Sequence, residues 1–411
     1  MKSLGLIGFG ISNQAVFNHF KNDFKITVHN RDEIPLPSIA YACFGDGYLN
    51  CSEDIVFRSP GVRPDKIKTE GPVFCEATYA LDNIKDTKLC ITGSDGKTTT
   101  STLIYEILKR KNAFLGGNIG APLIDAICGG YDFIVSELSS FQLMDASPIC
   151  DVAIITGITE NHLDYHTDMA EYISAKENLL KNAKRIILNY DNEILRKIGK
   201  KYKNTEYFSL EQPCDAYICD GYFCVKNKKL FSVDKIKLRG KFNLLNVLAA
   251  ILATYSYATD SEIKNAICSF KGVKHRLELV RELDGIKFYN SSIDSTPSRT
   301  VATLSAFDIS KCVVILGGSD KNLSYDILGE HLKDAKAILI MGENKQKLLD
   351  ALNKCVNKIY VVNNLSEAVK IGFSLCKKDD CLILSPASCS FDMYENYIAR
   401  GNDFTRLINN L

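Results

Sequence analysis

The sequence has no excess of charge of either sign. Its 411 residues include 50 Lys and Arg against 49 Asp and Glu, which gives a formal net charge of +1. So small a net charge argues against a general nucleic-acid binder or a membrane-surface binder. No apolar stretch approaches membrane-span length, and the short apolar run at the N-terminus is interrupted by Gly5, Gly8 and Gly10, with no cleavage site after it. We therefore expect a protein that binds neither membranes nor nucleic acids, and we separately expect it to be a cytoplasmic monomer.

The cysteines lack the spacing of a zinc site. Fifteen are scattered along the chain, and Cys214, Cys219 and Cys224 recur every five residues without paired histidines. We interpret them as reduced, mostly buried thiols of a cytosolic protein. Internal repeats and low-complexity tracts are also missing. What the chain does have is apolar content and length: 46% of its residues are hydrophobic, and 411 residues predict two or three domains.

An apolar run, a glycine-rich turn and a helical pattern together mark a nucleotide site. Residues 88–92 predict a buried strand, and residues 98–111 predict a helix. The glycines let backbone N–H groups face a polyphosphate, the helix N-terminus adds its positive end, Lys97 adds a charge and Thr98 a hydroxyl for Mg²⁺. The full pattern has a glycine where this chain has Ile91, so an ordinary strand–turn–helix is the alternative; the Gly-Lys-Thr-Thr sequence argues against it. The predicted nucleotide-binding residues are Gly93, Ser94, Asp95, Gly96, Lys97, Thr98 and Thr99.

A Rossmann-like pattern opens the chain. Residues 3–7 and 24–29 predict strands, joined by a Gly-x-Gly turn and a helix. Asn13 stands where the dinucleotide fingerprint has its third glycine, and Arg31 follows the second strand where an acid would hold a nicotinamide ribose. A tight turn and a ligand site are both open interpretations. If a ligand binds here, Arg31 suits a phosphate or uridine group better than NAD. This domain is predicted to end near Asp86.

Polar residues follow the strands of the second predicted domain. Glu137 ends a buried strand over residues 133–136, where phosphate-loop folds commonly present an acid to Mg²⁺. A surface glutamate is the alternative, and the polar residues around Glu137 argue against it. His162 follows the next strand on the side of the phosphate loop, which favours a ligand role over a structural one. A helix is predicted over residues 171–183, and by composition alone Lys176 on it is a solvated lysine.

An alanine-rich helix near residue 243 carries two asparagines on one face. Asn243 and Asn246 lie three positions apart, so they share a face near the helix N-terminus. Helix capping explains one asparagine, whereas two after a Gly-Lys pair indicate contact with a base or ribose. The second domain is predicted to close at about Arg276.

The remaining residues predict another doubly wound sheet. Each predicted strand ends in polar or small residues, and ligands are expected at the carboxyl ends of such strands. Because these residue types also form turns, each is weak evidence by itself. The predicted strands cover residues 287–290, 312–316, 337–341, 358–362 and 381–384.

Taken together and in order, these segments resemble the Mur ligase family, the ATP-dependent amide-bond-forming enzymes of peptidoglycan precursor synthesis. The family's own phosphate loop is shortened, which accounts for Ile91. The resemblance covers nearly the whole chain and implies an α/β fold of three domains. These are a Rossmann-like domain binding a UDP substrate over residues 1–86, a central ATP-binding P-loop domain over 87–276 and a C-terminal Rossmann-like amino-acid-binding domain over 277–411. The matching motifs occupy residues 92–99, 117–120, 137–143, 159–164, 175–176 and 275–276.

Within the family, the chain is most similar to the member that joins D-glutamate to UDP-N-acetylmuramoyl-L-alanine. The similarity rests on Arg31, on the Gly-Gly-Ser-Asp-Lys turn at 317–321 and on residues 384–392 followed by an Arg-Gly pair. Two positions depart from the pattern: Phe242 replaces a usual histidine, and Ser291 stands where an aspartate often contacts nucleotide. Those two nucleotide contacts stay open.

The resemblance also implies the chemistry. A substrate carboxylate attacks the γ-phosphate of ATP, and the amine of D-glutamate then attacks the acyl phosphate. Since the first step joins two anions, charge neutralisation by Lys97 and two Mg²⁺ ions is the main task. Thr98 and Glu137 are implied as ligands of the first ion, and His162 with a carbamylated Lys176 as ligands of the second. The implied binding residues are Asn243, Asn246 and Arg276 for ATP; Gly10, Ile11, Ser12, Arg31 and Asn118 for the UDP substrate, with Asn118 near the reacting carboxylate; and Ser295, Lys321, Ser390, Phe391 and Tyr397 for D-glutamate.

Two other functions stay open. One is another Mur-type or folylpolyglutamate amide ligase. The other is a dinucleotide-dependent oxidoreductase, which the N-terminal turn alone would allow. ATP hydrolysis that depends on an acyl acceptor and D-glutamate would indicate the ligase, and a nicotinamide-linked absorbance change would indicate the oxidoreductase.

Overall fold

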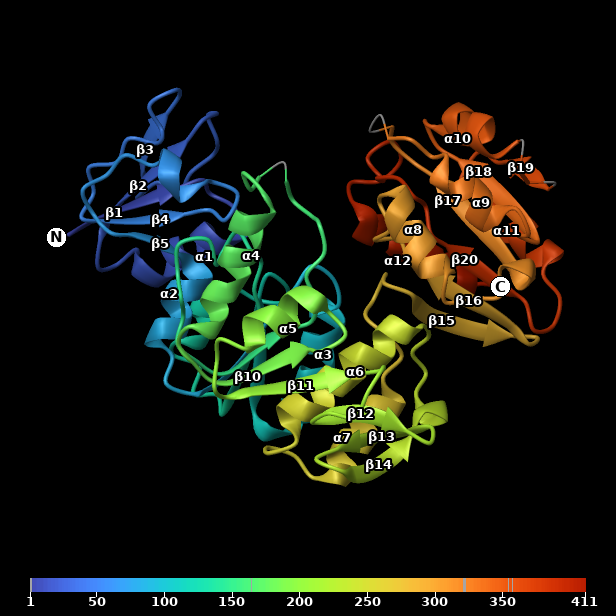
Figure 1. The fold of residues 1–411 in the computed structure, drawn as a ribbon. Coiled ribbons are helices and arrows are strands. Elements are labelled where there is room, and N and C mark those ends of the chain that lie inside the picture. Colours follow the sequence, from blue (N-terminus) through green and yellow to red (C-terminus); the bar gives the residue numbers. More distant parts are fainter. Residues whose placement is uncertain (1, 164, 321–322, 354, 357) are drawn as a thin grey trace. The chain divides into compact units, whose positions relative to one another are not determined.

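The computed structural model describes residues 2–163, 165–320, 323–353, 355–356 and 358–411 (Figure 1). The chain divides into two compact units. The first contains Met1–Ile236 and Phe242–Ser269, and the second contains Lys237–Lys241 and Phe270–Leu411. The described residues form three separate sheets, two in the first unit and one in the second. The α/β fold class predicted from the sequence is confirmed. The domain boundaries after residues 86 and 276 stay predictions.

The first sheet is a five-stranded parallel sheet in the order β3-β2-β1-β4-β5. Alternate residues of its strands, such as Leu4, Leu6 and Val28, are fully buried in the core shared with the flanking helices. Such burial is expected for parallel strands covered on both faces. The elements are β1 (Ser3–Ile7), α1 (Ile11–Phe20), β2 (Lys25–Asn30), β3 (Tyr41–Phe44), β4 (Ile55–Arg58), β5 (Val73–Cys75) and α2 (Glu76–Asn83).

The second sheet has nine strands in the order β14-β13-β12-β11-β10-β9-β6-β8-β7. Strands β7 to β12 and β6 are parallel, and β13 and β14 form an antiparallel edge. The interior strand β6 (Thr87–Thr92) leads directly into the glycine-rich loop and α3 (Lys97–Leu108). The other elements are β7 (Ala113–Gly117), β8 (Phe133–Glu137), β9 (Cys150–Ile155), α4 (Met169–Glu177), β10 (Ala183–Asn189), α5 (Glu193–Gly199), β11 (Thr205–Ser209), β12 (Ala216–Cys219), β13 (Tyr222–Val225), β14 (Lys228–Ser232), α6 (Lys241–Thr254) and α7 (Asp260–Ser269).

The third sheet has six strands in the order β15-β16-β20-β17-β18-β19, parallel except for the antiparallel edge strand β15. Successive residues of β17 belong to two different apolar cores: Val314 packs with residues of α8, α9 and α10, and Val313 with residues of α11 and α12. This alternation places helices on both faces, as in a doubly wound sheet. The elements are β15 (Glu278–Leu283), β16 (Ile286–Asn290), α8 (Pro297–Leu304), β17 (Cys312–Gly317), α9 (Ile327–Leu332), β18 (Ala337–Met341), α10 (Lys345–Leu352), β19 (Ile359–Val361), α11 (Leu365–Leu375), β20 (Cys381–Leu384) and α12 (Tyr397–Asn409).

The helix predicted over residues 171–183 differs from the structure. Helix α4 begins earlier, after the N-cap Asp168, and ends at Glu177. A 3₁₀ turn follows, and Ala183 already belongs to β10. The side chain of Asn178 donates a hydrogen bond to the carbonyl of Leu143, 2.8 Å away, so a contact outside the helix fixes its end. That contact lies beyond any local sequence pattern.

No helix among the residues that the structure describes has both the length and the apolar character needed to cross a membrane.

Candidate functional site

The loop between β6 and α3 is packed so closely that two of its glycines cannot be replaced without strain. Gly93 has a φ of +149°, and a Cβ there would lie 2.1 Å from Oγ1 of Thr156. Gly96 has a φ of +81°, and its Cβ would lie 2.3 Å from Oδ1 of Asn246. Helix α3 begins at the next residue, so its first N–H groups point toward the loop. The loop that the sequence predicts to bind phosphate is therefore a tight turn at a helix N-terminus, and its binding of phosphate stays a prediction.

Lys97 folds back over this loop. Its Nζ donates hydrogen bonds to the carbonyl oxygens of Gly93 and Ser94, at 2.8 and 2.9 Å. The ammonium therefore lies at the turn itself, beside the N-terminus of α3. Both place positive potential where a polyphosphate is expected.

Lys176 is buried beside the same loop. Its side chain is 1% exposed, and its Nζ donates to the carbonyl of Gly93 at 2.9 Å and lies 4.6 Å from the ring centre of Tyr172. Burial, together with the charge of Lys97, lowers the pKa of the Lys176 amine well below its usual value. The interpretation of Lys176 as a solvated lysine, which composition alone favoured, is therefore wrong.

Glu137 presents an open carboxylate oxygen at this edge of the sheet. It is 1% exposed and lies at the end of β8, opposite Ile91 in the register with β6. Oε1 accepts a hydrogen bond from the side-chain amide of Asn118 at 2.8 Å. Oε2 has no hydrogen-bond partner among the described residues. A buried carboxylate with an open oxygen suits a hard cation such as Mg²⁺, and the Thr98 hydroxyl on the first turn of α3 is a ligand of the same kind.

His162 is exposed and has a strained backbone. Its φ is +57°, in the left-handed region that residues other than glycine rarely adopt. Its ring centre lies 5.0 Å from that of Phe141, four residues beyond Glu137, and 6.4 Å from that of Tyr172 on α4. The structure thus brings His162 to the segments that carry Glu137 and Lys176.

The asparagines of α6 support the phosphate loop. Asn246 is 5% exposed, and its amide donates to Oδ1 of Asn243 at 3.1 Å. Oδ1 of Asn246 accepts from the hydroxyl of Thr100 on α3. Their predicted contact with nucleotide stays a prediction.

Two arginines that the sequence reasoning missed link the first sheet to this site. Arg58, fully buried at the end of β4, donates to both oxygens of Asp145 and to the carbonyl of Phe141. Arg63 forms two 3.0 Å hydrogen bonds to the carboxylate of Glu171 on α4. For Arg58, the sequence did contain a signal of a functional role, since a charged residue ends an otherwise apolar strand. The sequence around Arg63 contains no comparable signal, because its partner Glu171 lies 108 residues away.

His166 completes this polar group. It is 2% exposed, and its Nε2 lies 2.9 Å from the hydroxyl of Ser140, three residues after Glu137. Its Nδ1 lies 3.4 Å from Glu171. Burial lowers the pKa of His166, which favours the neutral ring. The ring joins the Glu137 segment to α4.

The predicted uridine-binding residues lie at the carboxyl edge of the first sheet. Gly10 precedes α1, and Arg31 follows β2 and is exposed. The amide of Asn13 is buried and donates to the carbonyls of Ile7 and Gly8, at 3.0 and 2.8 Å. Asn13 therefore stabilises the turn itself, which explains why the third glycine of the fingerprint is missing.

The predicted amino-acid-binding residues of the second unit follow the carboxyl ends of β16 and β20. Arg400 is fully buried there and donates to the carbonyls of Ser388 and Cys389 and to the hydroxyl of Ser292. It holds together the segments that carry the candidates Ser295, Ser390, Phe391 and Tyr397. Arg276 also lies in this unit. Lys321 lies outside the described residues.

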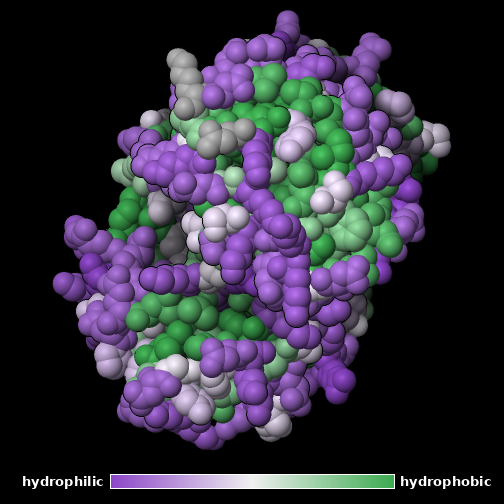
Figure 2. Space-filling view, turned by 90° about the vertical axis from the view of Figure 1, so that its right-hand side faces the viewer, coloured by the Kyte–Doolittle hydropathy of each residue, from purple (hydrophilic) through white to green (hydrophobic). Residues whose placement is uncertain are grey.

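Several large apolar side chains of the predicted binding segments are exposed. Figure 2 shows one face of the molecule, on which apolar groups lie among hydrophilic ones. The exposed side chains include Ile11, Phe242 and Phe391, at 77%, 43% and 67%. Each belongs to a segment that the sequence predicts to bind a substrate or nucleotide, which is where exposed apolar groups are expected.

Comparison with known proteins identifies the family. The Mur ligase middle domain matches residues 91–254, and the Mur ligase glutamate ligase domain matches residues 275–388. The UDP-N-acetylmuramoylalanine--D-glutamate ligase of Ruminiclostridium cellulolyticum is 40% identical, over 100% of this chain and 97% of that protein. The chain belongs to the Mur ligase family. The enzyme of the same name from Clostridium tetani is 35% identical to this Mur ligase over the same shares.

Solved structures support the fold of this Mur ligase. The UDP-N-acetylmuramate-alanine ligase of Thermotoga maritima matches with a TM-score of 0.64 at 20% identity, covering 100% of both chains. The MurF ligase of Thermotoga maritima in complex with ADP matches with a TM-score of 0.62 at 18% identity, covering 99% of this chain and 95% of that one. Members of the family are ATP-dependent, amide-bond-forming ligases that use Mg²⁺. Membership therefore disfavours the oxidoreductase alternative.

Proposed function

We propose that this Mur ligase joins D-glutamate to UDP-N-acetylmuramoyl-L-alanine, with cleavage of ATP to ADP and phosphate, in peptidoglycan precursor synthesis. The relatives that match over the full chain are named for this reaction. The observation that carries the proposal is the buried Lys176, whose Nζ lies 2.9 Å from a carbonyl of the phosphate loop. An amine with a lowered pKa is more easily carbamylated, and the carbamate would place an anionic Mg²⁺ ligand beside the phosphates of ATP.

The reaction proceeds in two balanced steps. A carboxylate oxygen of the UDP substrate forms a bond to the γ-phosphorus of ATP while the bond to ADP breaks. The amino nitrogen of D-glutamate then forms a bond to the acyl carbon, phosphate leaves with the oxygen of the former carboxylate, and the nitrogen loses a proton. Lys97 and the N–H groups at the start of α3 offset the charge that gathers when the carboxylate meets the phosphate.

We infer that two Mg²⁺ ions bind at this edge of the sheet. Bound Mg²⁺ neutralises phosphate oxygens and orients them. Glu137, with its open buried oxygen, and Thr98 would hold the first ion, and His162 with a carbamylated Lys176 the second. A carbamate forms only from a neutral amine, and the lowered pKa of Lys176 favours that form. Asn118, bonded to Glu137, would orient the reacting carboxylate.

The three sheets would bind different parts of the substrates. Gly10, Ile11, Ser12 and Arg31 would hold the uridine nucleotide, and Asn243, Asn246 and Arg276 the ATP. Lys321, Ser390, Phe391, Tyr397 and Ser295 would hold D-glutamate. We further propose that the enzyme acts in the cytoplasm as a monomer.

An amino-acid panel tests the proposed function. The purified chain is incubated with UDP-N-acetylmuramoyl-L-alanine, ATP and Mg²⁺, and ADP release is measured with each amino acid in turn. D-glutamate is expected to give the highest rate, and omission of the UDP substrate to abolish it. A higher rate with another amino acid, or with a folate as acyl acceptor and L-glutamate as amine, would assign the chain to a different amide ligase.

A further inference from the structure

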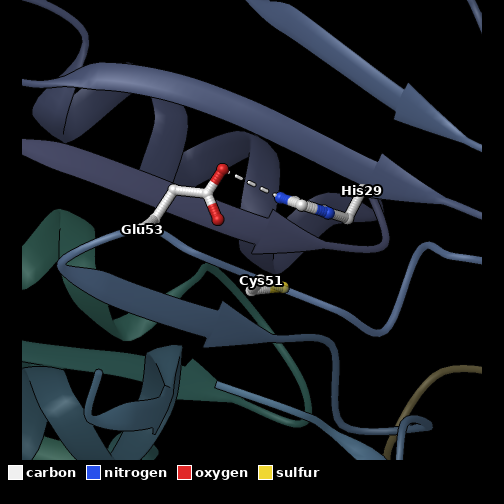
Figure 3. Close-up of side chains that lie close together, drawn as sticks. All are labelled: His29, Cys51 and Glu53. Carbon is white, nitrogen blue, oxygen red and sulfur yellow. Dashed lines mark hydrogen bonds and ion pairs between the residues drawn. The ribbon is translucent and has the colours of Figure 1, made fainter. Parts of the chain in front are cut away.

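His29, Cys51 and Glu53 form a buried cluster in the first sheet (Figure 3). Each offers one ligand atom, and these three atoms all lie within 4.8 Å of one another. The side chains of His29, Cys51 and Glu53 are 3%, 7% and 9% exposed. Nitrogen, sulfur and oxygen from these three residue types are the donors that zinc prefers.

The three residues come from two separate segments. His29 is on β2, whereas Cys51 and Glu53 belong to the segment that passes from β3 to β4. Nε2 of His29 lies 3.0 Å from Oε1 of Glu53. Gly5 on β1 leaves room for this carboxylate, because a Cβ at residue 5 would lie 3.1 Å from Oε2 of Glu53. The three side chains are therefore packed together against one face of the sheet.

The contact between His29 and Glu53 leaves one potential ligand atom of this cluster without a partner. Nδ1 of His29 is buried and has no hydrogen-bond partner among the described residues. A buried polar atom without a partner costs free energy, and a bound ion would use it or reorient the ring. For His29 and Glu53 to bind one ion, the contact between Nε2 and Oε1 of Glu53 must open so that each residue contributes its own bond to the metal.

The net charge and surroundings also suit a divalent ion. A Cys51 thiolate and a Glu53 carboxylate carry two negative charges, which a divalent cation neutralises, so the loaded site holds no net charge in the interior. Burial, followed by the charge of Glu53, raises the pKa of Cys51 to about 12, so metal binding must displace the thiol proton.

Cys43 is the residue of β3 that pairs with His29. It stands directly opposite His29 in the parallel register of β2 and β3, so both side chains lie on one face of the sheet. It is partly exposed on the edge strand β3, which gives an ion a route from solvent. Either Cys43 or a water can fill the fourth position of a tetrahedral site.

We propose that His29, Cys51 and Glu53 bind one zinc-class divalent ion, which clamps the segment between β3 and β4 onto β2. An ion about 2.0–2.3 Å from each ligand atom fits between these side chains after small rotations. This site is separate from the Mg²⁺ ligands proposed at the phosphate loop. The proposal does not depend on which amino acid the ligase uses.

Cobalt binding to the full chain tests the site. The chain is stripped of metal with a chelator, and Co²⁺ is added in steps while the sulfur-to-cobalt charge-transfer absorbance is measured. Oxygen-rich Mg²⁺ sites lack sulfur and do not give this band. We expect the wild type to saturate at one Co²⁺ per chain, and Zn²⁺ to displace the Co²⁺. Absence of the band in the wild type would overturn the proposal.

Matched cysteine variants locate the ion. Cys51→Ser is expected to remove the band and to weaken Zn²⁺ binding by about tenfold or more. Cys128→Ser, which changes an exposed cysteine in the same way, should leave both unchanged. Glu53→Gln should weaken binding while keeping a weaker band. An unchanged band in Cys51→Ser would refute the assignment.

A measurement on the wild type alone covers the case in which the variants do not fold. X-ray absorption at the zinc edge of the loaded chain is expected to show sulfur together with nitrogen and oxygen neighbours, and Zn²⁺ should raise the thermal unfolding temperature. Zinc surrounded by nitrogen and oxygen alone would contradict ligation by Cys51.

Discussion

At the scale of single residues, the candidate site depends on groups that burial has made reactive. Burial and the charge of Lys97 lower the pKa of the Lys176 amine, and Glu137 keeps an open oxygen in an interior where such atoms are rare. Neither state follows from the residue type. Substitutions at these positions therefore test chemistry more than folding.

Replacing Lys97 with alanine should abolish ligation and leave the fold intact. Lys97 is partly exposed, and its Nζ donates hydrogen bonds to the loop carbonyls of Gly93 and Ser94. We expect the rate to fall about a hundredfold or more, equivalent to roughly 3 kcal/mol of lost transition-state stabilisation. ADP release measures the loss, and circular dichroism checks the fold. Near-normal turnover at saturating ATP would reject this role.

Replacing Lys176 with alanine should leave little activity, and short carboxylic acids should restore part of it by taking the place of the carbamate. Removing bicarbonate should also lower wild-type activity. The control is Lys181→Ala, a solvent-exposed lysine just beyond the same helix, which should behave as wild type. Full activity of Lys176→Ala would rule the role out. An inactive variant that no small acid rescues would count against the carbamate.

At the scale of elements, Arg63 fastens the segment after β4 to helix α4. Its hydrogen bonds to Glu171 and to the carbonyl of Tyr165 brace the loop that carries His162. The hydrogen bond from Arg63 lowers the pKa of Glu171 from its usual value of 4.5 to about 2. Because the folded-state pKa is depressed, this stabilisation is present above about pH 4.5 and is lost as the pH falls toward 2.

Replacing Arg63 with alanine should lower the free energy of unfolding at pH 7 by about 1.5–3 kcal/mol, the usual effect of hydrogen bonds to a charged group. It should also reduce the further loss of stability between pH 4.5 and 2, since the variant has already lost the interaction. Urea unfolding at several pH values measures both effects. Lys66→Ala, on the same short segment, is the control. If the loss of stability between pH 4.5 and 2 is the same in the variant and the wild type, Arg63 is not the cause of the low pKa of Glu171.

At the scale of the whole molecule, the predicted substrate contacts are distributed over three sheets. The chain passes between the two compact units after Ile236, after Lys241 and after Ser269. The uridine-nucleotide residues and the phosphate loop both lie in the first unit, but on different sheets. Substitutions at the uridine and ATP sites should therefore affect different Michaelis constants.

Replacing Arg31 with alanine should raise the Michaelis constant for the uridine nucleotide by roughly tenfold, the effect of one charge-assisted hydrogen bond, and leave that for ATP unchanged. Steady-state kinetics with each substrate varied in turn measures the two constants. The exposed neighbour Asp32 offers the control variant Asp32→Ala. A weaker affinity for ATP with an unchanged one for the uridine nucleotide would place Arg31 elsewhere in the mechanism.

The sequence by itself determined the phosphate loop, the order of the domains and the family, because these depend on local patterns. Glycines between an apolar strand and a helix permit few other structures, and Gly93 and Gly96 do adopt backbone angles that suit glycine. Features that depend on contacts distant in the chain were predicted less accurately. Helix α4, for example, ends at Glu177 and not at residue 183.

Only the tertiary structure decided the environment of the catalytic candidates. Lys176 is buried because a loop 83 residues earlier in the chain lies against it, and Arg63 meets Glu171 across 108 residues. His29, Cys51 and Glu53 likewise have no recognisable spacing in the sequence, yet the register of β2 and the segment before β4 bring them together. Burial and charge pairing depend on neighbours distant in the chain, so no local pattern of residues could specify them.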